Sequence, residues 1–161
     1  MKKAFASSLF ALLLAVALAS IVLAAPARAA QRTVLAGTDF KVFGPSGPIS
    51  FDGPWAMWDV PLTGTFNFGA LAGTEAWRSH VKLDFATGIG FVSGKVTFTD
   101  AATGLTCSGS FEGKVANYLL GPAHFALPCS DGSLLTGTMQ DVSGNLVIGV
   151  AGEFHGELLT H

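Results

Sequence analysis

Apolar and polar residues alternate with a period of two along most of the chain after residue 30, and Gly, Asp and Asn separate the alternating runs. The clearest run places Trp77, Ser79, Val81, Leu83 and Phe85 on one side, with Arg78, His80, Lys82 and Asp84 on the other. Beyond residue 30 no stretch keeps a helical period. This pattern predicts half-buried antiparallel strands, with one face toward a core and the other toward water.

Similar runs occur at 92–99, 105–114 and 146–158, and weaker ones at 33–43, 56–60, 62–68, 122–129 and 134–142. Turn-forming residues lie between them, for example Asp131-Gly132 and Ser143-Gly144-Asn145. The pattern predicts an all-β fold, a single antiparallel up-and-down β-barrel of about eight strands. In architecture alone, it resembles lipocalin-type and allene-oxide-cyclase-type barrels, and the sequence has no motif of either family. A β-sandwich is the alternative.

Several glycines fall on the predicted apolar face, among them Gly94, Gly109 and Gly152. A glycine inside a strand allows sharp coiling of the sheet, or lets a neighbouring ring lie over the backbone. Such positions favour a tightly curved sheet, and therefore the barrel over the sandwich.

The N-terminus has the three parts of a secretory signal: Met1-Lys2-Lys3, an apolar run at 4–25, and the small-x-small sequence Ala27-x-Ala29. We therefore predict a signal peptide at residues 1–29 and a single barrel domain at residues 30–161, secreted or periplasmic. The apolar run is long enough to be an uncleaved anchor. Pro26 and the overlapping cleavage sites favour removal, and we expect no stable membrane span after processing.

Cys107 and Cys129 are the two cysteines of the chain. In an exported protein they predict a disulfide bond. If strands 105–115 and 122–129 pair with these cysteines opposite each other, the turn centres on Tyr118 and Phe111 faces Phe125.

Charge is scarce, because Asp, Glu, Lys and Arg make up only 12% of the chain. Without the signal peptide, six basic residues remain against eleven acidic ones, a net charge near −5. Nucleic acid is therefore not an expected partner, since binding to phosphates needs clustered Lys and Arg. The low charge predicts either a large apolar interior or a surface covered in a homo-oligomer.

The segment 44–61 is rich in proline and aromatic residues, and such long connections are often functional. We considered it as an apolar plug, a lid that contacts a ligand, or an exposed docking patch. Together with the rings predicted to point inward, it supplies the candidate ligand-binding residues Phe51, Trp55, Trp58, Trp77, Phe85, Phe111 and Phe154.

Candidate chemistry is sparse. Glu153, His155 and Glu157 share one strand face, which makes them weak candidates for a metal site; the polar face of an ordinary strand explains them more simply. No nucleophile elbow, zinc-binding motif or phosphate loop occurs in the sequence. We predict no catalytic residue, no resident metal and no cofactor.

The leading functional hypothesis is an exported, non-enzymatic barrel that binds a small apolar molecule or lipid. The alternatives are a structural or interaction module that forms oligomers at the cell envelope, and a cyclase-type barrel enzyme. An outer-membrane barrel is disfavoured by the single tyrosine and by the lack of aromatic girdles.

Overall fold

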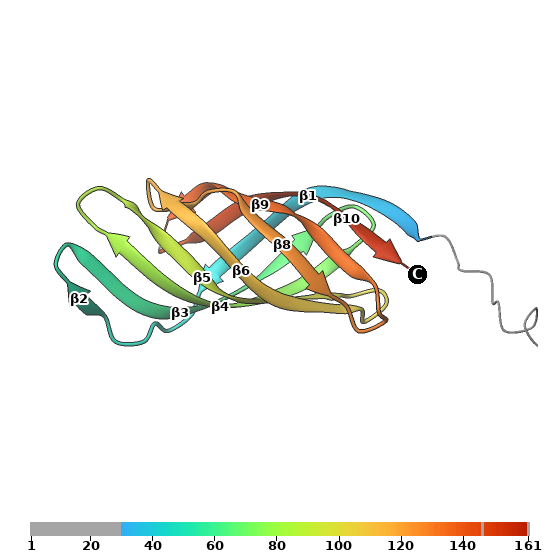
Figure 1. Ribbon diagram of the computed structural model, residues 1–161, viewed down its shortest axis with the longest axis horizontal. Coiled ribbons are helices and arrows are strands. Elements are labelled where there is room, and N and C mark those ends of the chain that lie inside the picture. Colours follow the sequence, from blue (N-terminus) through green and yellow to red (C-terminus); the bar gives the residue numbers. More distant parts are fainter. Residues whose placement is uncertain (1–29, 146, 161) are drawn as a thin grey trace, which may run out of the picture.

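The computed structural model describes residues 30–145 and 147–160, and 75% of it is strand. The strands are β1 (Gln31–Phe43), β2 (Ser50–Asp52), β3 (Trp55–Asn67), β4 (Ala72–Asp84), β5 (Ile89–Asp100), β6 (Thr106–Ala116), β7 (Leu119–Leu120), β8 (Ala123–Pro128), β9 (Leu134–Asn145) and β10 (Gly149–Thr160). Eight of them are long, and β2 and β7 are short additions (Figure 1).

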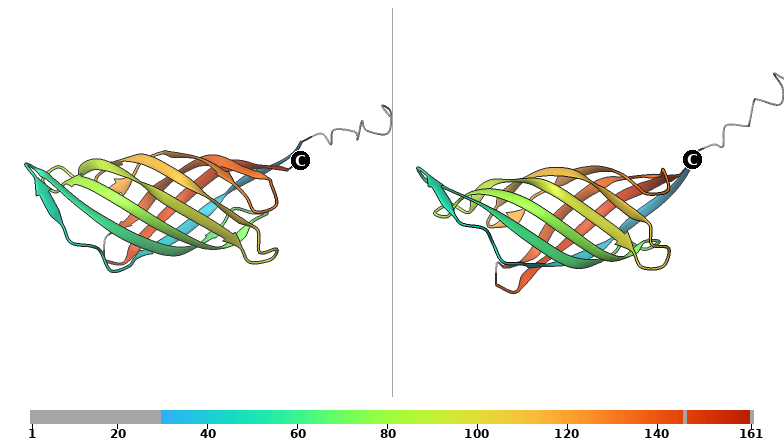
Figure 2. Two further views of the ribbon diagram at one scale, coloured as in Figure 1. Left: turned by 60° about the horizontal axis from the view of Figure 1, so that its bottom comes forward. Right: turned by 90° about the horizontal axis from the view of Figure 1, so that it is seen from below.

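The strands form one antiparallel sheet that coils into a nearly closed barrel (Figures 1 and 2). The long strands follow one another around the barrel in chain order, and β1 closes the ring by pairing with both β3 and β10. The predicted up-and-down barrel is therefore confirmed. The β-sandwich alternative is not, because the strands form a single sheet.

The predicted alternation is clearest in β4, where Trp77, Ser79 and Leu83 are buried and Arg78 and His80 are exposed. The two weak runs at 56–60 and 62–68 are a single strand, β3, that continues through Pro61. The last strand was predicted to begin at Leu146, which lies outside the described residues. β10 begins at Gly149, because the preceding residues form a turn in which Asn145 Oδ1 accepts hydrogen bonds from Val147 N and Ile148 N.

The seam between β6 and β8 is the one place around the described barrel where no continuous ladder forms. Cys107 and Cys129 form the predicted disulfide there and are also paired as an isolated β-bridge. At the other end of the seam β6 turns into β7 through Asn117 and Tyr118, both at positive φ.

The predicted pairing of 105–115 with 122–129 is confirmed at the Cys107–Cys129 bridge but does not extend along the strands, and the turn has two central residues rather than Tyr118 alone. Pro122 precedes β8 and Pro128 is its last residue, and proline has no N–H to donate to a ladder. Across the gap the expected contact between Phe111 and Phe125 does form, with ring centroids 6.2 Å apart.

A cluster of aromatic rings fills the barrel at the end where β3 leads into β4. Phe68 is fully buried and stacks on Phe154, with ring centroids 4.2 Å apart. Phe98 packs edge-to-face against both Phe66 and Phe68. The interior at this end is a solid core, so any space for a ligand lies toward the opposite end.

Glycines on the inner side allow the tight coiling, as their sequence pattern predicts. At Gly94 of β5 a β carbon would overlap the backbone carbonyl of Arg78 on β4. The two strands therefore approach more closely than any residue with a side chain permits.

No helix in residues 30–145 and 147–160 is long and apolar enough to cross a membrane.

Candidate functional site

A cavity of about 260 Å³ occupies the half of the barrel opposite the aromatic core. Its wall is mostly apolar and is formed by residues of β1, β3, β4, β5, β6, β7, β9 and β10 and of the connections at their ends. The main contributors are Trp58, Val60 and Leu62 of β3, Trp77 and Leu83 of β4, Val92 of β5, Phe111 and Val115 of β6, and Val150 of β10.

The cavity reaches the surface at the end of the barrel from which the β2–β3 hairpin projects (Figure 1). Ile49, Phe85 and Tyr118 line this mouth, and each is between 43% and 49% exposed. The Tyr118 hydroxyl donates a 2.6 Å hydrogen bond to the carbonyl of Phe85, which ties the β6–β7 turn to the β4–β5 turn. The ring of Phe85 stacks on Trp58 with a centroid separation of 5.6 Å.

Charged side chains form the floor of the cavity, although they lie inside the barrel. Lys41 of β1 and Asp141 of β9 both line the cavity, with side chains 3% and 8% exposed. Lys41 Nζ lies 2.5 Å from Asp39 Oδ2 and 3.0 Å from Asp141 Oδ1, and it also contacts the Trp77 ring, 5.0 Å from its centroid. Burial lowers the pKa of Lys41, but the Asp141 and Asp39 carboxylates outweigh this effect and raise it, so the lysine is cationic.

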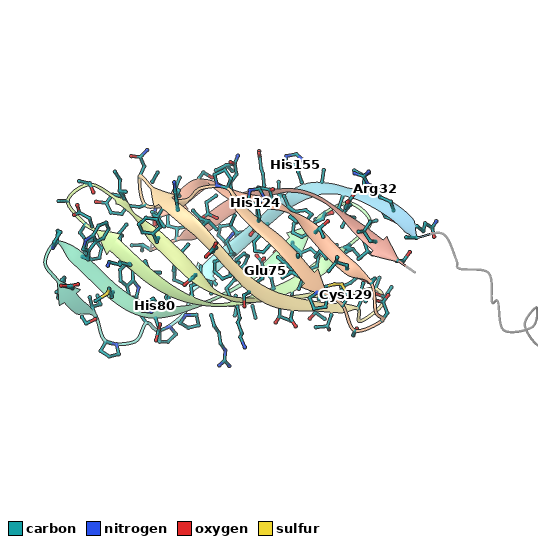
Figure 3. All side chains as sticks on the ribbon, in the orientation of Figure 1. Arg32, Glu75, His80, His124, Cys129 and His155 are labelled. Atoms are coloured by element: carbon teal, nitrogen blue, oxygen red, sulfur yellow. A yellow bond between two sulfur atoms is a disulfide. The ribbon has the colours of Figure 1, made fainter. Side chains whose placement is uncertain are left out.

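Glu75 of β4 lies behind this floor, near the middle of the barrel (Figure 3). Burial and the neighbouring Asp39 charge raise its pKa to about 9. Glu75 Oε2 accepts a hydrogen bond from Trp77 Nε1, whereas Oε1 has no partner, and neither has Oδ1 of Asp39. A proton held by Glu75 and donated to Asp39 satisfies both oxygens, so Glu75 is neutral at pH 7.

Backbone features make room for these charges. A β carbon at Gly152 would overlap the Asp39 carboxylate, and one at Gly64 would lie 2.8 Å from Glu75 Oε1. In β9 the pairing with β10 shifts after Asp141, so that Val142 becomes an extra, outward residue of a β-bulge. Asp141 itself keeps the inward parity of Leu135 and Met139, and its Oδ2 accepts a hydrogen bond from Leu120 N.

The predicted ligand-binding residues fall into three groups. Trp58, Trp77, Phe111 and Phe85 line the cavity. Phe154 is buried in the aromatic core instead. Phe85 is 43% exposed rather than fully inward, because β4 ends at Asp84 and Phe85 starts the turn.

Phe51 and Trp55 lie outside the cavity. Phe51 is on β2 and is 70% exposed, and the ring of Trp55 lies on the outer face under the Lys82 ammonium. The segment 44–61 therefore does not plug the barrel. Its contribution to the cavity is Ser46 and Ile49 at the mouth, and Trp58 and Val60 in the wall.

The weak metal candidates lie on the outer face of β10. Glu153 and His155 are exposed, and Glu157 forms an ion pair with Arg32 of β1. His155 and Arg32 are labelled on the same side of the barrel in Figure 3. Within the described ranges no group of three or more His, Cys, Asp or Glu side chains is arranged to hold a metal ion.

The sequence pattern did not identify four residues of the site: Asp39, Lys41, Glu75 and Asp141. A signal was present for Glu75, which has the same parity as Trp77, Ser79 and Leu83 and therefore points inward. In β1 the usual pattern is inverted: Asp39 and Lys41 are buried while Phe40 and Val42 are exposed. An apolar-inside assignment places Asp39 and Lys41 on the wrong face.

Comparisons of this chain with protein-family models, with curated proteins and with solved structures gave no match.

Proposed function

We propose that the protein is an exported, non-enzymatic binding protein that holds a small apolar molecule in the end cavity of its barrel. The observation that carries the proposal is the cavity itself: about 260 Å³, lined mainly by aliphatic and aromatic side chains, with a few polar groups at one end. Binding sites for small molecules have this composition, in which apolar walls supply affinity and a few polar groups fix orientation.

The polar groups favour binding over catalysis. Lys41, Asp141 and Tyr118 are the ionisable residues on the described cavity wall. Lys41 and Asp141 are held in an ion pair, and the Tyr118 hydroxyl donates to a backbone carbonyl. Glu75, whose raised pKa would suit a general acid, does not line the cavity. Export is supported by the disulfide, which persists in oxidising compartments, and by the signal-like N-terminal sequence.

Binding can be followed through tryptophan emission, because Trp58 and Trp77 line the cavity. We expect octanol, a neutral apolar molecule, to change this emission in a saturable way. Val92→Phe fills part of the cavity and should weaken octanol binding, whereas Ser93→Phe adds the same ring to the outer face of the same strand and should not.

Mass spectrometry of an organic extract of the purified protein should also release a bound apolar molecule. Absence of such a molecule, together with unchanged emission at all octanol concentrations, would refute the proposal.

A second candidate, a homo-oligomer, is favoured by the apolar outer side chains of β1. Val34, Phe40 and Val42 are 73%, 43% and 43% exposed. Light scattering after size exclusion tests it, since a monomer at micromolar concentration excludes a stable oligomer through this strand.

A further inference from the structure

The cavity floor carries a net negative charge. Among the described residues, Lys41 and Asp141 line the floor, Asp39 is buried against Lys41, and Glu75 behind them is neutral when protonated. Two carboxylates against one ammonium give a net charge of −1. If Glu75 loses its proton, the net charge of the floor becomes more negative. The net charge is therefore negative in both protonation states of Glu75.

One carboxylate oxygen of Asp141 accepts no hydrogen bond from the described residues. Its Oδ2 is used by Leu120 N, and Oδ1 lies 3.0 Å from Lys41 Nζ in an ion pair that lacks hydrogen-bond geometry. No donor among residues 30–145 and 147–160 forms a hydrogen bond to this oxygen. Because the side chain is 8% exposed and lines the cavity, a ligand is the group placed to satisfy it.

Lys41, in contrast, has its positive charge compensated by two carboxylates. Its ammonium group donates hydrogen bonds to Asp39 Oδ2 at 2.5 Å and to Met139 Sδ at 3.7 Å, and it forms the ion pair with Asp141 Oδ1 at 3.0 Å. A carboxylate at the floor would therefore face the lone pairs of Asp141 and a net negative charge.

We propose that the ligand is an apolar primary amine, with its ammonium group against Asp141 Oδ1 and its chain directed to the mouth. This inference rests on the proposed binding function and specifies the ligand class. An alkylammonium donates to the free oxygen and brings the charge of the floor to zero. An alcohol donates to the same oxygen but leaves the negative charge of the floor uncompensated. A carboxylate adds a further negative charge to the floor.

The cavity volume sets the length of the chain. At about 30 Å³ for each water-sized group, about 260 Å³ holds about nine such groups. An eight-carbon chain with one terminal atom has that size. Octylamine, octanol and octanoate therefore form a matched series that differs only in the polar end.

The test is isothermal titration of the intact protein with these three compounds at pH 7. We expect octylamine to bind on the order of 100-fold more tightly than octanoate and on the order of tenfold more tightly than octanol, because like charges repel and unlike charges attract in a buried site. The inference would be overturned if octanoate bound as tightly as octylamine, or if octanol bound more tightly than octylamine. Either result would leave the binding function in place. If none of the three binds, the proposed function itself fails.

Asp141→Asn tests the named residue. The amide oxygen can still accept from Leu120 N, but the floor becomes neutral, so the preference for octylamine over octanoate should fall by at least on the order of tenfold while octanol binding changes little. Glu75→Gln is the matched control, because Glu75 lies behind the floor and is neutral already. This variant should bind the three compounds in the same order of affinity as the unmodified protein. An unchanged preference in Asp141→Asn would contradict the assignment, and the ranking in the unmodified protein decides the ligand class even if this variant does not fold.

Discussion

The indole N–H of Trp77 donates a 3.0 Å hydrogen bond to Oε2 of Glu75, two residues earlier on the same inner side of β4. The bond fixes the carboxyl group beside Asp39, in a place where a second negative charge is strongly disfavoured. A proton is therefore part of the folded structure, and folding must take it up from solution at neutral pH.

The first prediction concerns stability and pH. The ordinary pKa of the Glu75 carboxyl is 4.5, and in the barrel it is about 9. The stabilisation that comes from the bound proton is therefore complete below pH 4.5 and is lost as the pH rises to about 9. Stability should fall over that range by up to about 1.4 kcal/mol for each pH unit. Glu75→Gln, which is neutral at every pH, should flatten this slope and be the more stable protein at pH 8. Urea denaturation at several pH values measures this.

Glu112→Gln serves as the control for that experiment, because Glu112 is exposed on β6. Its slope should match that of the unmodified protein. Equal slopes for Glu75→Gln and the unmodified protein would show that Glu75 is ionised in the folded state.

A second prediction concerns the seam between β6 and β8. The Cys107–Cys129 disulfide joins residues 22 positions apart at a place where no ladder holds the strands together. Replacing both cysteines with serine should lower the free energy of unfolding by roughly 3 kcal/mol. Reductant should lower the stability of the unmodified protein by a similar amount and leave the double variant unchanged. A variant as stable as the oxidised protein would mean that packing alone holds the seam.

Coiling of the sheet can be tested at Gly94. A methyl group there would overlap the Arg78 carbonyl, so Gly94→Ala must separate β4 from β5. We expect a loss of about 1–3 kcal/mol, as for other overpacked sites. Gly47→Ala is the control, because a β carbon at residue 47 would meet its nearest atom, Asp59 O, at an ordinary 3.6 Å. Thermal or urea denaturation compares the two, and equal losses would rule out close strand approach as the cause.

The tryptophans should differ in their response to a ligand. Trp58 lines the cavity, whereas Trp55, three residues earlier, lies on the outer face beneath Lys82. Trp55→Phe should keep the emission change produced by octanol, and Trp58→Phe should lose a large part of it. The reverse result would place the ligand on the outside of the barrel.

The sequence predicted the fold because β-barrel strands show their inner and outer faces directly. Trp77, Leu83 and Phe111 lie where their alternation places them, and the cysteines joined β6 to β8. The boundaries were harder to predict. Phe85 has the parity of Leu83, but parity does not show where a strand stops, and the turn begins at that residue.

The floor of the cavity could not be predicted in the same way. Asp39 and Lys41 point inward only because each finds an opposite charge and Gly152 leaves space for the Asp39 carboxylate. These partners come from β9, β10 and β1, and only the strand order brings them together. Asp141, by contrast, has the inward parity of Leu135 and Met139, and the β-bulge changes only the facing of the residues that follow it.

Gln31 and Thr160 pair at the end of the barrel opposite the β2–β3 hairpin, so both ends of the described chain lie far from that hairpin, beside which the cavity opens (Figure 1). A tether attached at either end would hold the molecule with its entrance pointing away from the support. Immobilised protein should therefore capture ligands from the surrounding solution as freely as protein that is not attached, and a bulky fusion partner at either end would leave the entrance unobstructed.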